Sequence, residues 1–175
     1  QKKVKKKKSK KTKTVKKTAK KHYKKNSQKI CMRIGSQEIQ YLNAFQTISR
    51  ANAKDCLVGA NSISFVVSEG QMGKTIGKKG STIKRLRQAL QKNVELFEHK
   101  KSVESFLQNA FPEILFEGFE KKREGEKTVI TAKINTENKK KIMNDAGKIK
   151  RVKELAKRNY GIDDFHIHCE NSLEV

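Results

Sequence analysis

The sequence lacks a long apolar stretch, since no segment approaches the roughly 18 apolar residues that a transmembrane helix needs. The N-terminus also lacks the apolar core of a secretory signal. Cys31, Cys56 and Cys169 are odd in number and share no C-x-x-C spacing, so we do not expect a disulfide framework. Unpaired, buried thiols suit a reducing compartment. These absences predict a cytoplasmic protein that makes no contact with a membrane.

Acidic residues are missing from positions 1–29, although this segment contains 16 lysines. The rest of the chain carries 26 basic and 18 acidic residues, which is +8 of the total net charge of +24. Like-charged lysines with almost no large apolar residues cannot build a core, so we expect a disordered tail that binds phosphates nonspecifically. A solubilising or targeting tail is the alternative. The tail and the moderately basic body both favour a polyanionic partner, RNA or DNA.

A glycine-bracketed turn with the pattern I-G-x-x-G occupies residues 76–80 and is followed at once by a basic amphipathic helix. Gly77 and Gly80 permit a sharp turn and the close approach of another backbone. Ser81 and Thr82 stand where a helix N-cap belongs, and the free N–H groups of a helix start favour an anion. The turn therefore predicts a clamp for nucleic-acid phosphates. The residues predicted to bind RNA are Lys74, Ile76, Gly77, Lys78, Lys79, Gly80, Ser81, Lys84 and Arg85.

This turn lies in a context that makes it more specific than a lone G-x-x-G. A strand-like run at residues 63–67 precedes it, and a short strand at 94–97 follows the second helix. The arrangement resembles the signature loop of the KH domain, a module that clamps single-stranded nucleic acid. The alternative is a helix–turn–helix packing corner whose glycines only allow close contact.

Apolar periodicity predicts the order helix, strand, strand, helix, helix, strand over residues 30–100. The first helix has an apolar stripe made of Ile39, Leu42, Phe45 and Ile48. The elements expected here are a helix capped by Ser36, strands at 55–58 and 63–67, helices at 72–76 and 81–92, and a strand at 94–97.

The same order of elements is predicted over residues 101–170, which indicates an internal duplication. A constant offset of 66 places Ile142 at the position of Ile76 and Arg151 at that of Arg85. The elements expected here are a helix around 103–111, strands at 114–119 and 129–134 joined by a charged hairpin at 121–127, helices at 136–142 and 146–159, and a strand at 165–167.

The clamp glycines are not repeated in the second copy. The offset places Met143 at the position of Gly77 and Ala146 at that of Gly80, and Asp145 puts negative charge where a phosphate would lie. We therefore expect a second copy with a disabled clamp. Its remaining candidates for RNA contact are the basic segments 139–141 and 148–151.

Residues 36 to 170 resemble the archaeal NusA-like transcription factors, which consist of two KH domains in series. The resemblance rests on the capped first helix, on Lys54-Asp55-Cys56, on residues 69–73 before the I-G-x-x-G turn, and on residues 158–164 before the last strand. It implies an α+β fold of two tandem type II KH domains, each with a three-stranded sheet and helices on one face. It also implies RNA binding tied to transcription termination or antitermination, with nascent transcript as ligand and RNA polymerase as a further candidate partner.

Composition and the internal duplication divide the chain into a lysine-rich tail at 1–29, which departs from the family pattern, a first KH domain at 30–100, a second at 101–170 and a C-terminal tail at 171–175. A KH protein of the ribosome or of ribosome assembly is the alternative function, because a lysine tail also suits folded rRNA.

Two patterns that would indicate other chemistry are incomplete. Gly73-Lys74-Thr75 begins like the end of a P-loop, but the required glycine five residues earlier is Ser68. His166, His168 and Cys169 cannot share one face of a strand, which makes them a poor zinc site. No nucleophile stands beside a base. We expect a binding protein, not an enzyme, with no cofactor and no metal.

Overall fold

The first half of the chain forms a three-stranded sheet covered by helices. A computed structural model describes residues 35–170, so both predicted tails lie outside the described residues. The sheet has the order β1-β2-β3, in which β1 and β2 are antiparallel and β2 and β3 are parallel. The elements of this half are α2 (Ser36–Ser49), β1 (Ala53–Val58), β2 (Ser62–Val67), α3 (Met72–Ile76), the 3-10 turn η1 (Lys78–Gly80), α4 (Ser81–Leu90) and β3 (Asn93–Glu98).

The second half repeats this order and pairing. Its sheet has the order β4-β5-β6, again with one antiparallel and one parallel pair. The predicted sequence of helices and strands is therefore confirmed in both halves. The elements of this half are α5 (Val103–Ala110), β4 (Phe116–Glu124), β5 (Lys127–Asn135), α6 (Thr136–Met143), α7 (Ala146–Tyr160) and β6 (Asp164–Glu170).

The first helix starts differently from the prediction. Gly35 is the N-cap of α2, and Ser36 is already helical. The Glu38 carboxylate reaches back and accepts a hydrogen bond from the Gly35 N–H at 2.7 Å, which satisfies a group that a serine cap would leave to water. Ile39 is also not part of the buried stripe, because its side chain is 50% exposed.

The charged segment predicted as a hairpin loop is mostly strand. β4 begins only at Phe116, but it runs through Glu124, and the turn is confined to Gly125 and Glu126. A strand at the edge of a sheet tolerates charged side chains, since most of them point to solvent. The Glu120 carboxylate pairs with Lys133 of β5 at 2.9 Å, which ties the two strands together.

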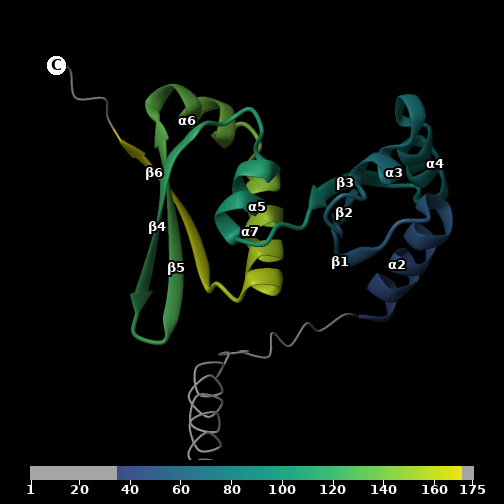
Figure 1. Ribbon diagram of the computed structural model, residues 1–175, viewed down its shortest axis with the longest axis horizontal. Helices are drawn as coiled ribbons and strands as arrows, with labels where there is room; N and C mark the ends of the chain where they lie inside the picture. The colour runs from purple at the N-terminus through teal and green to yellow at the C-terminus, as the bar shows by residue number, and fades with distance from the viewer. Residues whose placement is uncertain (1–34, 171–175) are drawn as a thin grey trace, which may run out of the picture.

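The central strand of the first sheet is buried on both faces. Ile63, Phe65 and Val67 face α2 and α4, and Phe65 packs on Phe45 with ring centroids 4.5 Å apart. Because side chains alternate along a strand, Ser64 and Val66 face the opposite way. Val66 belongs to the core of the second half, so α5 and α7 cover this face, as Figure 1 shows.

The resulting order of layers is α2, α3 and α4, then the first sheet, then α5 and α7, then the second sheet (Figure 1). Phe97 of β3 packs on Phe106 of α5, with ring centroids 6.3 Å apart. The helices that cover the second sheet thus also cover the first. This shared layer joins the two halves through one hydrophobic core.

Helix α7 also makes polar contacts with the first half at three places along its length, two with strands of the first sheet and one with the segment that follows β3. Near its start, Arg151 donates two hydrogen bonds to the Glu95 carboxylate, at 2.7 and 2.6 Å. At its end, the Tyr160 hydroxyl donates to the Lys100 carbonyl at 2.9 Å and accepts from the Lys100 N–H at 3.0 Å, and its ring stacks on His99. These contacts fix where the second half lies on the first.

The third contact surrounds Asp55, whose side chain is fully buried. Arg158 Nη2 lies 2.9 Å from one Asp55 oxygen in an ion pair, and Asn159 donates to the other oxygen at 2.9 Å. Arg158 Nη1 also donates to Glu38 at 3.1 Å and to the Cys56 carbonyl at 3.3 Å. Burial raises the pKa of Asp55, and Arg158 opposes that shift. Two segments that carried the family resemblance, one around residue 55 and one around residue 158, therefore meet in space.

We predict that Arg158→Met will lower the free energy of unfolding by about 3 kcal/mol at neutral pH, because it leaves the buried Asp55 carboxylate without its cation. Without Arg158 the folded-state pKa of Asp55 rises further. A group whose pKa is higher in the folded state than in the unfolded state adds stability at pH values below its unfolded-state pKa. That stability is lost as the pH rises through the folded-state pKa. The loss should therefore be smaller near pH 4 than at pH 7 in urea titrations.

The double variant Asp55→Asn with Arg158→Met is the matched control, since it removes both charges and should recover part of the loss. Equal losses for the single variant at both pH values would contradict this account of the pair.

Candidate nucleic-acid interface

The I-G-x-x-G turn has a backbone that requires glycine at its first position. Gly77 adopts φ 73° and ψ 172°, in a region that L side chains rarely occupy. A Cβ placed there would lie 2.2 Å from Thr82 Oγ1 and 2.9 Å from the Thr82 nitrogen. Gly80 also has a positive φ of 74°, but the nearest atom to its added Cβ, Ile83 Cγ2, is 3.8 Å away. Gly77 is thus required both by its positive φ and because a Cβ would collide with Thr82, whereas Gly80 is required by its positive φ alone.

Helix α4 begins without a capping side chain. Its N-cap is Gly80, and no side chain accepts a hydrogen bond there. The prediction that Ser81 and Thr82 supply the cap is wrong: Ser81 is the first helical residue, and Thr82 packs against Gly77. Because no side chain caps the helix start with a hydrogen bond, its N–H groups and its dipole remain available to an external anion.

All nine residues predicted to bind RNA lie on the continuous segment from α3 through η1 to α4, at the far side of the first sheet from α5 and α7 (Figure 1). Ile76 is 40% exposed, which leaves an apolar side chain beside the turn. Among residues 35–170 no carboxylate forms an ion pair with the basic members of the set. Those exposed basic residues are Lys74, Lys78, Lys79, Lys84 and Arg85.

The corresponding turn of the second half has a different structure. Asp145 is the N-cap of α7, and its Oδ1 accepts a hydrogen bond from the Lys148 N–H at 3.0 Å. Asn144 has an ordinary helical φ of −64°, so the left-handed turn is absent here. A carboxylate of the chain itself therefore occupies the helix start that is open in the first half.

Arg151 also differs from its counterpart. It corresponds to the exposed Arg85, yet its guanidinium is turned inward and bound by both oxygens of Glu95. The expectation that Arg151 is available for RNA contact is therefore wrong. Helix α7 lies against the first sheet, and the Glu95 carboxylate of β3 binds the Arg151 guanidinium. No sequence pattern signalled this, since Glu95 lies in a different half.

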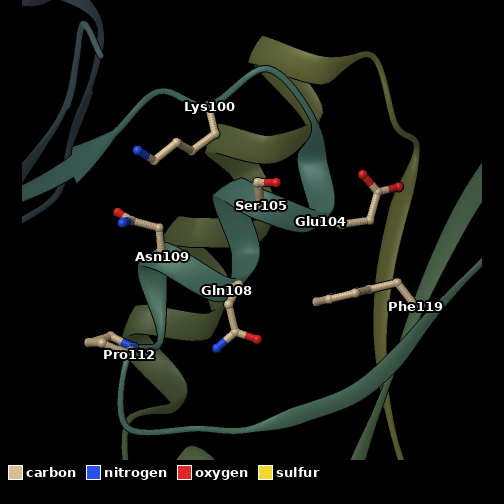
Figure 2. A pocket seen from close by; sticks show the side chains of 7 residues that line it. All are labelled: Lys100, Glu104, Ser105, Gln108, Asn109, Pro112 and Phe119. Atoms are coloured by element: carbon tan, nitrogen blue, oxygen red, sulfur yellow. The ribbon is translucent and has the colours of Figure 1, made fainter. Parts of the chain in front are cut away.

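A groove of about 550 Å³ lies on the second half, away from the I-G-x-x-G turn. Figure 2 shows Phe119 pointing from β4 toward α5, which supplies Glu104 and Gln108. The Lys100 ammonium at its margin is already paired with Glu98 at 2.6 Å. The Ser105 hydroxyl accepts a hydrogen bond from the Ser102 hydroxyl at 3.0 Å.

The residues that suggested other chemistry have structural partners. The buried Thr75 hydroxyl donates to the Gln71 carbonyl at 3.1 Å, so it is not presented as in a P-loop. Burial raises the pKa of Cys56 to about 12, which keeps its thiol protonated. His166 lies 3.5 Å from Asp164, and no group of three potential ligands for a metal occurs within residues 35–170.

In the same described segment, no helix has the length and apolar character to cross a membrane.

Comparison with known proteins adds independent findings. The family model described as the KH domain matches residues 38–147, which is more than half of the chain. The chain is 32% identical over 138 residues to the probable transcription termination protein NusA of Halobacterium salinarum, covering 78% of this chain and 98% of that protein. It is 28% identical over 141 residues to the protein of the same name from Methanocaldococcus jannaschii, covering 80% and 77%.

A solved structure shows the same similarity in three dimensions. The crystal structure of APE1850 superimposes with a TM-score of 0.70 at 29% sequence identity, and the match covers 77% of this chain and 100% of that one. The likeness therefore extends over both halves and not only over the I-G-x-x-G turn.

We predict that Gly77→Ala will destabilise the protein more than Gly80→Ala. An alanine at either position adopts a positive φ, at a cost of roughly 1–2 kcal/mol, but only the alanine at position 77 also collides with Thr82. Chemical denaturation of the two variants measures the difference, and each is the other's control. Equal destabilisation would show that the contact with Thr82 does not hold the turn.

Proposed function

The chain belongs to the KH-domain family of archaeal NusA-like proteins, and from that premise we propose that it binds single-stranded RNA through the turn of its first half. The observation that carries the proposal is the uncapped start of α4 behind Gly77 and Gly80, beside two exposed lysines that no carboxylate neutralises within the described residues. The RNA backbone passes over the turn, where the glycines present no Cβ, and a phosphate lies at the helix start. Lys78 and Lys79 supply the opposing charge.

The proposal includes the domain division expected from the sequence. Residues 30–100 and 101–170 are two type II KH domains, of which only the first holds nucleotides. The support for this asymmetry is the Asp145 carboxylate, which accepts the Lys148 N–H at the helix start where a phosphate would bind. A second anion beside that carboxylate would be repelled.

We place the RNA binding in transcription, with nascent transcript as the ligand and termination or antitermination as the process. The support is the name of the relatives, probable transcription termination protein NusA, which two archaeal proteins that the chain matches over most of their length share. That name favours transcription over the ribosomal alternative. RNA polymerase is the protein partner that this role implies, and the proposal assigns the chain no catalytic step.

The double variant Lys78→Asp with Lys79→Asp tests the clamp. In a chain lacking residues 1–29, it should weaken binding of single-stranded RNA by about tenfold or more, because two charges now repel the phosphates. Both side chains are exposed, and aspartate tolerates the positive φ of residue 79, so the fold should persist. Fluorescence anisotropy measures the affinity.

Lys121→Asp with Lys127→Asp is the matched control, because it makes the same change of charge at exposed positions of the β4–β5 hairpin. Affinity of the Lys78/Lys79 variant within twofold of the parent would refute the clamp, and so would an equal loss in the control.

A second experiment separates the tail from the clamp. The 16 lysines of residues 1–29 should add affinity by releasing counterions, with a logarithmic salt slope of roughly −0.7 per neutralised phosphate. Deleting the tail should flatten the salt dependence and leave any base preference intact. A deletion that abolished base preference but kept the slope would contradict this division.

A further inference from the structure

The region around α4 carries positive charge that the proposed clamp does not account for. Residues 70–94 contain seven basic residues and no acidic one, and the clamp set includes five of the seven. The remaining two are Arg87 and Lys92. Arg87 Nη2 lies 3.5 Å from the Val94 carbonyl, and Lys92 donates to the Gly59 carbonyl at 2.9 Å, so their hydrogen-bond partners are uncharged. In the part of the chain that the structure describes, neither residue has a carboxylate partner.

Helix α7, the equivalent helix of the second half, has its arginines neutralised within the protein. Arg151 pairs with Glu95, and Arg158 pairs with Asp55. Both carboxylates belong to the first sheet, against which α7 packs. Helix α4 lies on the other side of that sheet (Figure 1), and within the described residues no carboxylate pairs with any of its basic side chains. The charge on α4 therefore does not stabilise the fold through ion pairs, and it remains available to an external anion.

The charged residues of α4 form an exposed stripe that leads away from the glycine turn. Lys84 and Gln88 are four residues apart and so lie one above the other on the helix, with Arg87 beside them. All three are exposed, whereas Leu86 on the opposite side is fully buried. The ten residues of α4 are roughly 15 Å long. Lysine, arginine and glutamine side chains all bind phosphate oxygens, so the stripe can follow a nucleic-acid backbone over that length.

This stripe offers no support for an unpaired base or for a protein partner. Residues 70–94 contain no aromatic residue, and Ala89 is the one exposed apolar residue of α4. Surfaces for single strands stack bases on aromatic rings, and protein interfaces are anchored by aromatic and apolar side chains. A double-stranded RNA keeps its bases stacked within the helix and presents phosphates and 2′-hydroxyls. A polar, basic face without aromatics suits such a stem.

We propose that the outer face of α4 binds the backbone of a double-stranded RNA stem next to the single strand held by the turn. Arg87 contacts phosphates of the stem, with Gln88 and Lys84 in line beside it. The inference rests on the proposed function and deepens it, because the ligand becomes a junction between a single strand and a stem. Its selectivity is for RNA shape and not for base sequence, since no side chain of the stripe reaches into a stacked helix.

Three RNAs test the proposal in fluorescence anisotropy with the full-length chain. The first is a short unpaired strand. The second joins this strand to a hairpin stem of about eight base pairs, which is longer than the roughly 15 Å of α4. The third joins it to an unpaired strand with the same number of phosphates as the hairpin. The hairpin RNA should bind more tightly than the unpaired RNA of equal charge.

Arg87→Glu is the decisive variant, because residues 1–29 are common to every protein compared. It should weaken the hairpin RNA roughly fivefold, since one phosphate contact becomes a repulsion, and leave the short strand within about twofold. Arg87 is exposed and glutamate favours helices, so the variant should fold. Arg123→Glu is the matched control, the same charge reversal at an exposed position of the β4–β5 hairpin. It should leave the preference for the hairpin RNA unchanged.

The outcomes distinguish this inference from the clamp. Lys78→Asp with Lys79→Asp should weaken all three RNAs, and unchanged binding of the short strand would refute the clamp without touching the preference for a stem. Equal affinity of the parent for the hairpin and unpaired RNAs would overturn the stem site, as would equal effects of Arg87→Glu and Arg123→Glu. Displacement of the hairpin RNA by an equal concentration of a glutamate-rich peptide would also overturn it, because the face would then accept any polyanion.

Discussion

The packing of α7 against the first sheet is the contact on which the rest of the structure depends. It buries Asp55 and brings Arg158 and Asn159 to it, in a place that an isolated KH unit would expose to water. A buried carboxylate is costly unless it is paired, so the two halves stabilise each other only when they are correctly joined. The hydrophobic layer of α5 and α7 serves both sheets at once, so the core of the second half also includes Val66 and Phe97 of the first sheet, while α2 and α4 cover a second cluster on the other face of that sheet.

This contact also explains how two copies of one pattern acquire different chemistry. Helices α4 and α7 occupy equivalent places, but α4 lies at the outer face of the first sheet and α7 lies between the sheets. Arg85 therefore points to solvent, whereas Arg151 meets Glu95. An open helix start with unpaired lysines suits an anion, while a helix start capped by Asp145 does not. The same fold thus presents an open helix start beside exposed lysines in the first half and a helix start capped by a carboxylate in the second.

Much of the fold was predictable, because it depends on local periodicity. Phe45 lies on the apolar stripe predicted for the first helix, and it is fully buried. The predictions are wrong where two neighbouring residues could each take one structural position, or where one segment could form either a loop or a strand. Gly35, whose N–H is bound by the Glu38 carboxylate, takes the N-cap position expected for Ser36. The charged run expected to join two strands is mostly part of an edge strand, whose Glu120 pairs with Lys133 of the neighbouring strand. Such choices depend on partners that periodicity does not identify.

The sequence by itself determined the order of elements, the duplication, the glycine turn and the loss of its glycines in the second copy, since each is a pattern of neighbouring residues. Only the tertiary structure decided that Thr82 makes Gly77 irreplaceable, that Arg151 is withdrawn from the surface, and that Asp55 is buried against Arg158. Glu95 and Arg151 are 56 residues apart, and Asp55 and Asn159 are 104 apart. Contacts over such separations follow from how sheets and helices pack, and packing is a property of whole surfaces and not of any one segment.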